Sequence, residues 1–338
     1  MSTPITISPS QLQQALIFSL EHRFNLLIVG APGIGKTEII NQACDAAGMH
    51  MIVSHPVVSD PTDYKGLPFV VNGDRAEFLP FGDLRQLIEA TAPTVFFLDD
   101  VGQAPPSVQA AAMQLLLARR INGHLIAEHV RFIAATNRRQ DKAGVQGVLE
   151  PVKSRFASIL HLQTDPEDWI KWALSKELPT ELIAFIRFRP ELLHDFKPTN
   201  DLVNSPSPRT VAFVGQMLNQ QLPQALEYAM ISGAAGEGFA TEFKAFLDIY
   251  RSLPNPDLIV LSPDKVEVPE DPSTLYALSG ALAKKAGPQN FANIIKYANR
   301  MPAEFSVLTI KDAVNRNPSL TSTRPFIAWA AEHNDVLI

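Results

Sequence analysis

Near the N-terminus the sequence reads Gly30-Ala31-Pro32-Gly33-Ile34-Gly35-Lys36-Thr37, directly after the apolar run Asn25–Gly30 and before a stretch of helical period. Glycines in such a turn let backbone N–H groups face phosphate oxygens, and the start of a helix adds partial positive charge. Lys36 can reach the β- and γ-phosphates, and Thr37 can supply an oxygen ligand to Mg²⁺. A chance glycine-rich turn rarely combines strand, spacing, lysine and threonine, so the stretch predicts a nucleotide phosphate site.

Outward from this turn, from residue 8 to residue 162, short apolar runs alternate with amphipathic stretches. This alternation is typical of a parallel sheet covered by helices, that is, an α/β fold. After Thr164 the strand-like runs stop, and proline-punctuated amphipathic helices follow. We therefore predict an α/β core over residues 1–164, an all-α lid over 165–253 and a C-terminal helical extension over 254–338. The strands expected after the first are His50–Ser54, Thr94–Asp99, Val130–Ala135 and Ala157–Leu162.

Two carboxylates end the third of these runs, Asp99 and Asp100. Ligands of open α/β sheets bind at the carboxyl ends of the strands, which is where both side chains would lie. Asp99 would hold Mg²⁺, and Asp100 would orient or deprotonate the attacking water. Aspartate also commonly ends strands without a chemical role, and this alternative applies more to Asp100.

Three further polar residues are candidates on weaker grounds. Asn137 follows an apolar strand, where its amide could hold water or the γ-phosphate, or simply form a turn. Arg155, before the last strand, is either a surface cation or a finger directed at a neighbouring subunit's γ-phosphate. Arg209 follows Ser207-Pro208, a helix start, where a cation opposes the helix dipole and favours an anionic partner.

The stretch 60–83 contains Asn72-Gly73 between apolar residues, as a hairpin turn does. It predicts a protruding β-hairpin, although an ordinary meander packed on the core is the alternative. Other chemistries lack support, because the sequence contains no HExxH metal motif and no GxSxG serine motif.

The composition of the chain limits the classes of partner that the protein is expected to bind. The formal charge of −6 gives no general attraction to nucleic acid, and 46% hydrophobic with 19% charged residues describe an ordinary folded protein. The single cysteine, Cys44, excludes an internal disulfide and favours a reducing compartment. We find no signal-like N-terminus and no apolar run of membrane-spanning length, so we expect a cytoplasmic protein without a membrane partner.

Taken together, the motifs GAPGIGKT, TVFFLDD, FIAATN, EPVKSRF and SPRT occur in an order that resembles AAA+ ATPases of the MoxR-like or dynein-related branch. Val101–Leu115 is similar to the segment after the acidic motif in those proteins, and residues 60–83 resemble their helix-2 insert. The resemblance covers about residues 8–250. The tail resembles that of bacterial and phage ATPases paired with von Willebrand factor A-like proteins.

This resemblance implies an AAA+ P-loop NTPase core and an ATP hydrolase with ATP and Mg²⁺ as cofactors. It makes Asn137 sensor 1, Arg155 the trans-acting finger and Arg209 sensor 2. Such proteins assemble as rings, usually hexamers, with ATP between subunits and the insert near the central pore. They remodel or activate protein partners, here including the possibility of a von Willebrand factor A-like protein.

One residue departs from the family pattern. Glutamate normally follows the magnesium aspartate, whereas this chain has Asp100, whose side chain is one methylene shorter. A misplaced general base would give slow hydrolysis, because a positioned one contributes roughly 10²–10⁴-fold. Two alternatives therefore stay open, namely a nucleotide-gated scaffold with weak hydrolysis and a nucleic-acid motor, which the acidic composition disfavours.

Overall fold

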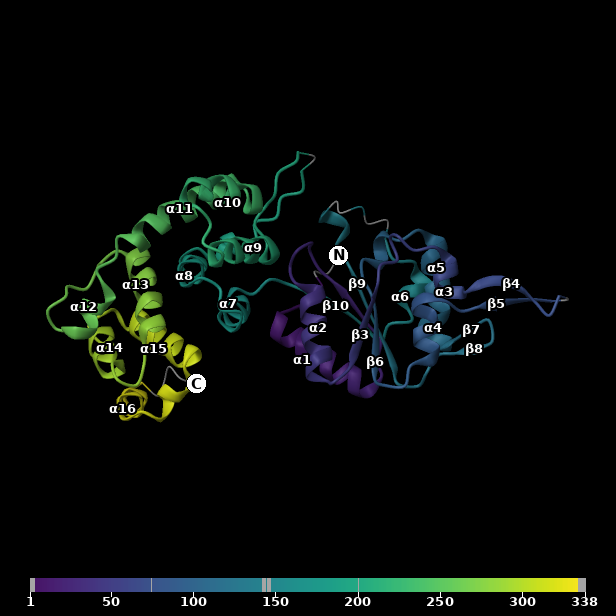
Figure 1. Ribbon diagram of the computed structural model, residues 1–338, viewed down its shortest axis with the longest axis horizontal. Helices are drawn as coiled ribbons and strands as arrows, with labels where there is room; N and C mark the ends of the chain where they lie inside the picture. Colours follow the sequence, from purple (N-terminus) through teal and green to yellow (C-terminus); the bar gives the residue numbers. More distant parts are fainter. Residues whose placement is uncertain (1–3, 74, 142–143, 145–146, 200, 334–338) are drawn as a thin grey trace. The chain divides into compact units, whose positions relative to one another are not determined.

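The computed structural model describes residues 4–73, 75–141, 144, 147–199 and 201–333. The chain divides into two compact units, Met1–Asp165 and Pro166–Ile338. Figure 1 labels the elements of both. No described helix is long and apolar enough to cross a lipid bilayer.

The first unit is built on a parallel sheet of six strands in the order β1-β10-β2-β9-β6-β3. All five expected strands are present, which confirms the predicted α/β class. The sheet also contains β1, which is only two residues long and so carries no recognisable hydrophobic period. The strands are β1 Thr6–Ile7, β2 Leu26–Val29, β3 His50–Ser54, β6 Thr94–Leu98, β9 Val130–Thr136 and β10 Ser158–Leu162.

Helices cover both faces of this sheet because successive strand residues point to opposite sides. In β2, Leu26 and Ile28 are buried in one cluster with α1 and α2. Leu27 is buried in the other cluster, with α3, α4 and α5. Figure 1 shows the two sets of helices on either side of the strands. The helices are α1 Pro9–His22, α2 Lys36–Ala46, α3 Pro61–Lys65, α4 Gly82–Glu89, α5 Pro106–Ala118 and α6 Glu150–Lys153.

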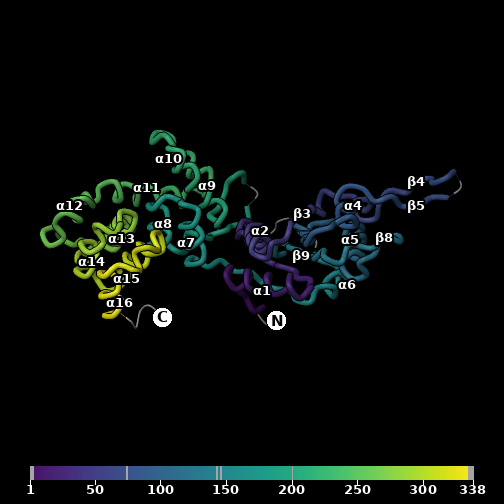
Figure 2. Tube along the Cα trace, turned by 60° about the horizontal axis from the view of Figure 1, so that its bottom comes forward, coloured from purple at the N-terminus to yellow at the C-terminus, as the bar shows by residue number. Residues whose placement is uncertain are grey.

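The stretch 60–83 contains an antiparallel hairpin, β4 Leu67–Val71 and β5 Arg75–Leu79. Asn72 and Gly73 begin its turn with φ of 56° and 78°, the left-handed values that both residue types tolerate. Figure 2 shows the hairpin extending from the unit that carries it. Its apolar side chains are exposed, with Phe69 at 64% and Val70 at 62%. A second, shorter hairpin, β7 Arg120–Ile121 and β8 His124–Leu125, was not expected.

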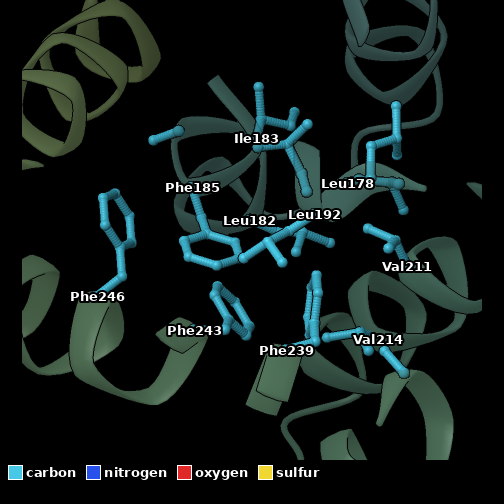
Figure 3. Close-up of a cluster of buried hydrophobic side chains, with 14 of the residues drawn as sticks. Leu178, Leu182, Ile183, Phe185, Leu192, Val211, Val214, Phe239, Phe243 and Phe246 are labelled. Atoms are coloured by element: carbon cyan, nitrogen blue, oxygen red, sulfur yellow. The ribbon is translucent and has the colours of Figure 1, made fainter. Parts of the chain in front are cut away.

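All described regular elements of the second unit are helices, which agrees with the predicted all-α C-terminal part. Figure 3 shows one of its cores, in which the ring of Phe185 lies among Phe239, Phe243 and Phe246. The helices are α7 Pro166–Ser175, α8 Thr180–Phe188, α9 Pro208–Asn219, α10 Glu227–Ala235, α11 Glu237–Arg251, α12 Pro256–Leu261, α13 Pro272–Lys285, α14 Phe291–Ala298, α15 Ala303–Arg316 and α16 Arg324–Glu332.

Helix α13 joins the residues expected as a lid to those expected as an extension. Ala277 is buried in the Phe185 cluster, whereas Leu278 is buried in a second cluster with α14 and α15. A largely buried ion pair between Arg187 of α8 and Asp312 of α15 connects the same two regions. Residues 165–253 and 254–338 thus pack into one unit, and their division into lid and extension remains a prediction.

Candidate nucleotide site

The glycine-rich turn connects β2 to α2. Gly33 and Gly35 have φ of 75° and 94°, which glycine adopts without strain. A Cβ at Gly30 would lie 2.4 Å from Ile34 Cδ1, so a larger residue here would displace the end of the Ile34 side chain. Helix α2 begins at Lys36, directly after the turn. The turn can therefore present backbone N–H groups and a helix N-terminus to a phosphate.

Lys36 is 7% exposed, and its ammonium is held by oxygens of the turn and of the neighbouring strand end. Nζ donates to the carbonyl oxygens of Gly30 and Ala31, each at 3.1 Å. It also donates to Asn137 Oδ1 at 2.7 Å. These contacts keep the ammonium beside the glycine-rich turn, where a phosphate oxygen would make a strong charge-assisted hydrogen bond with it.

Thr37 and Asp99 lie together across the turn. Thr37 Oγ1 donates to Asp99 Oδ2 at 3.1 Å, and Asp99 Oδ1 accepts from the backbone N–H of Asp100 at 3.0 Å. The described residues contain no group of three or more His, Cys, Asp or Glu side chains that could hold a metal. One carboxylate and one hydroxyl nevertheless fit Mg²⁺, which takes few protein ligands and completes its shell with phosphate and water.

Asn137 follows β9 and connects Lys36 to Asp100. Its Oδ1 accepts from Lys36, and its Nδ2 donates to Asp100 Oδ1 at 2.8 Å. Asp100 has φ of 54°, a left-handed conformation that aspartate tolerates, and it precedes the short 3₁₀ helix Val101–Gln103. The structure thus brings together the residues expected at the carboxyl ends of β2, β6 and β9.

Arg155 lies elsewhere in the same unit. Its carbonyl accepts from Asn25 Nδ2 at 3.4 Å, and Asn25 precedes β2 whereas Gly30 follows it. Five residue steps along a strand span about 16 Å. The guanidinium is turned onto α6, where Nη1 donates to the Pro151 carbonyl at 2.5 Å. Arg155 is therefore at the opposite end of the strands from Lys36.

Arg209 belongs to the second unit, where it is exposed in the first turn of α9. Ser207 caps this helix and accepts from the Thr210 N–H at 3.3 Å, as Ser-Pro before the helix predicts.

Sequence reasoning missed three buried polar side chains of the first unit, Ser54, Tyr64 and Gln109. Tyr64 of α3 and Ser54 of β3 share a hydroxyl hydrogen bond of 2.8 Å, and the Ser54 carbonyl accepts from the Asp99 N–H. Burial raises the pKa of Tyr64, so the phenol stays protonated at neutral pH. Gln109 of α5 is 1% exposed and makes three hydrogen bonds to backbone groups. A lone serine or glutamine on an apolar element carries no motif, so spacing could not have revealed either role.

Residues 25–156 match the family model described as the AAA domain of the dynein-related subfamily. This part of the chain therefore has the P-loop NTPase fold of AAA domains, a fold typical of nucleotide-binding ATPases. The match covers both the Lys36 turn and Arg155.

Solved structures similar to this chain include two of Thermotoga maritima RuvB. One, of a point mutant, has a TM-score of 0.43 and 16% identity, over 81% of this chain and 80% of that one. The other, described as the Holliday junction branch migration motor, has a TM-score of 0.40 and 14% identity, over 81% of each chain. A candidate ATPase from Cytophaga hutchinsonii has a TM-score of 0.34 and 15% identity, over 90% of this chain and 79% of that one. No curated protein matches the sequence significantly.

Proposed function

We propose that this protein is an ATPase of MoxR type that assembles into a ring of six copies and hydrolyses Mg-ATP between subunits. The observation that carries the proposal is the separation of Arg155 from Lys36 and Asp100. An arginine at the amino ends of the strands cannot serve the phosphate site at their carboxyl ends in the same copy. A second copy can place its Arg155 there.

In this mechanism Lys36 holds the β- and γ-phosphates, and the turn that ends at Gly35 supplies backbone N–H donors. Asp100 accepts a proton from the attacking water, while Asn137 fixes its carboxylate through the 2.8 Å hydrogen bond. Thr37 and Asp99 would hold Mg²⁺, which when bound neutralises phosphate charge. Arg155 of the adjacent copy and Arg209 stabilise the negative charge that develops on the γ-phosphate.

The work of the ring is to remodel or activate a protein partner in the cytoplasm, and a von Willebrand factor A-like protein is our proposed partner. The exposed apolar side chains of the β4–β5 hairpin support contact with protein, because contiguous exposed apolar surface commonly marks interaction sites. Helix α13 packs into both parts of the second unit, so movement of the lid would carry residues 254–338 with it.

The test is Mg-ATP hydrolysis per subunit measured over a wide range of protein concentration, with assembly followed by sedimentation. We expect specific activity to rise with concentration and then to saturate as rings form, because the arginine is supplied in trans. Full activity at concentrations where sedimentation finds only monomer would contradict the proposal.

A second candidate is a nucleotide-gated switch with weak hydrolysis. It is favoured by Asp100, whose carboxylate is one methylene shorter than the usual glutamate and is held by Asn137. In that case ATP would drive ring assembly, and turnover would stay near zero even in the assembled ring.

A further inference from the structure

Gln109 is the most completely buried polar side chain of α5, and it joins two segments that are distant in sequence. Its Nε2 donates to the carbonyl oxygens of Ala104 and Gly147, each at 3.0 Å. Its Oε1 accepts from the N–H of Leu149, also at 3.0 Å. The amide thus supplies two donors and one acceptor to backbone groups, a combination that no charged or apolar side chain of this length offers.

The first of these segments is the loop that begins at Asp100. Ala104 closes the 3₁₀ helix Val101–Gln103, and its N–H donates to the Val101 carbonyl at 3.3 Å. The N–H of Gly147 donates to the Gly102 carbonyl at 3.1 Å. The loop after Asp100 and the segment around Gly147 therefore lie directly against each other.

The second segment leads into α6 and Arg155. The Leu149 carbonyl accepts from the N–H groups of Val152 at 2.9 Å and Lys153 at 3.0 Å, so it forms the start of α6. The N–H of Arg155 donates to the Val152 carbonyl at 3.1 Å. The position of Arg155 thus depends on a helix whose N-terminal flanking residue is held by Gln109.

Arg155 retains unused hydrogen-bonding capacity. Its Nη1 is turned onto Pro151, but its Nε is buried without a hydrogen-bond partner among the described residues. A buried guanidinium N–H without an acceptor is costly, so rotation of the side chain away from Pro151 to meet a phosphate oxygen would be favoured.

We propose that Gln109 is a positioning residue for Arg155, acting across the subunit interface on the neighbour's nucleotide. It fixes α6 to the loop that follows Asp100 in its own subunit, and so sets where the arginine is presented. The inference rests on the proposed function, since it assumes that Arg155 acts in trans. Displacements of about 1 Å can cost 10²-fold in rate, so one side chain that holds a helix start can control catalysis.

The experiment mixes two full-length variants that are each inactive. Lys36→Ala subunits bind no nucleotide but still supply Arg155, whereas Arg155→Ala subunits bind ATP but supply no arginine. Mixed rings contain interfaces at which the first variant completes the site of the second. We therefore expect hydrolysis in the mixture and not in either variant alone.

Gln109→Met is then added to one partner at a time. In the Lys36→Ala subunits it should lower the restored activity about 10- to 100-fold, because the arginine is misplaced. In the Arg155→Ala subunits it should leave the restored activity within about twofold, because Asn137 still holds Asp100 there. Gln114→Ala, an exposed glutamine of the same helix, is the matched control and should have no effect in either partner.

Two controls and two contrary outcomes complete the test. Nucleotide binding by the Arg155→Ala, Gln109→Met subunits shows that the core remains folded, and Gln109→Glu, which keeps the acceptor but removes both donors, serves as a second variant. Equal losses in both partners, or a loss in neither, would overturn the positioning role. Absence of restored activity in the parent mixture would instead overturn the trans-acting arginine and with it the proposed function.

Discussion

One amide side chain serves two charged groups at the candidate site. Asn137 presents its carbonyl oxygen to the Lys36 ammonium and its NH₂ group to the Asp100 carboxylate. A flipped amide would place its NH₂ group against the Lys36 ammonium and its oxygen against the Asp100 carboxylate. The two neighbours therefore determine the orientation of the amide. The arrangement holds Asp100 in place.

Substitution of Asp100 distinguishes a protein that hydrolyses ATP from a nucleotide-gated switch with weak hydrolysis. Asp100→Asn removes the proton acceptor and should lower kcat by about 10²–10⁴-fold if Asp100 is the general base. Asp100→Glu restores the usual side chain and should leave kcat equal or higher. Steady-state hydrolysis with saturating Mg-ATP measures both variants, and nucleotide affinity should be unchanged in each.

The same two variants also define the result that would contradict a role of Asp100 as general base. If neither substitution changes kcat in assembled rings, Asp100 does not act as the base and the switch interpretation gains support. Asp83→Asn, a change to a carboxylate in α4, is the control for loss of one acidic group.

At the scale of elements, the longer strands and the helices could be predicted from the local sequence pattern, whereas the two-residue strands could not. The apolar runs of the sheet were recognisable because a strand covered on both faces is apolar along most of its length. Strand β1 pairs with the distant β10, whereas β7 and β8 pair with each other, and strands of two residues are too short to show a hydrophobic period. Ser207-Pro208 marked the start of α9, and a capping box is present there.

The cap of α9 gives a prediction about stability. Ser207→Ala removes the side-chain acceptor for the Thr210 N–H and should lower the free energy of unfolding by about 1 kcal/mol. All three tryptophans, Trp169, Trp172 and Trp329, lie in the second unit, so tryptophan fluorescence during urea unfolding reports its stability.

The control for this cap variant is Ser252→Ala. The Ser252 hydroxyl is exposed and donates to the Ile249 carbonyl at a helix end, a bond that water can replace. We expect a smaller change there. An unfolding midpoint for Ser207→Ala equal to that of the unsubstituted protein would show that the cap contributes nothing.

At the scale of the whole molecule, the two units have separate hydrophobic cores, and the proposed mechanism assigns roles to Lys36 of the first and Arg209 of the second. A ligand that contacts only the first unit stabilises only that unit, by about 2.7 kcal/mol at a concentration 100 times Kd. A ligand that also contacts Arg209 stabilises both.

Nucleotide should therefore shift the tryptophan unfolding transition if Arg209 binds it. We expect a non-hydrolysable ATP analogue with Mg²⁺ to raise the transition temperature of tryptophan fluorescence in the unsubstituted protein, and not in Arg209→Ala. Far-UV circular dichroism, which also reports the first unit, should still show stabilisation of that unit in the variant. If nucleotide stabilises the first unit of the unsubstituted protein but leaves the transition temperature of tryptophan fluorescence unchanged, the role of Arg209 is contradicted.

Local chemistry made the phosphate turn, the central strands and the helical second unit predictable from the sequence. Each depends on residues adjacent in the chain, such as the glycines before Lys36 or the apolar run before Asp99. The contacts that define the site are long-range, because Lys36 and Asn137 are 101 residues apart and Gln109 and Leu149 are 40 apart. Only folding brings such groups within hydrogen-bonding distance, and for that reason the bridging amide of Asn137 and the anchoring amide of Gln109 emerged from the tertiary structure alone.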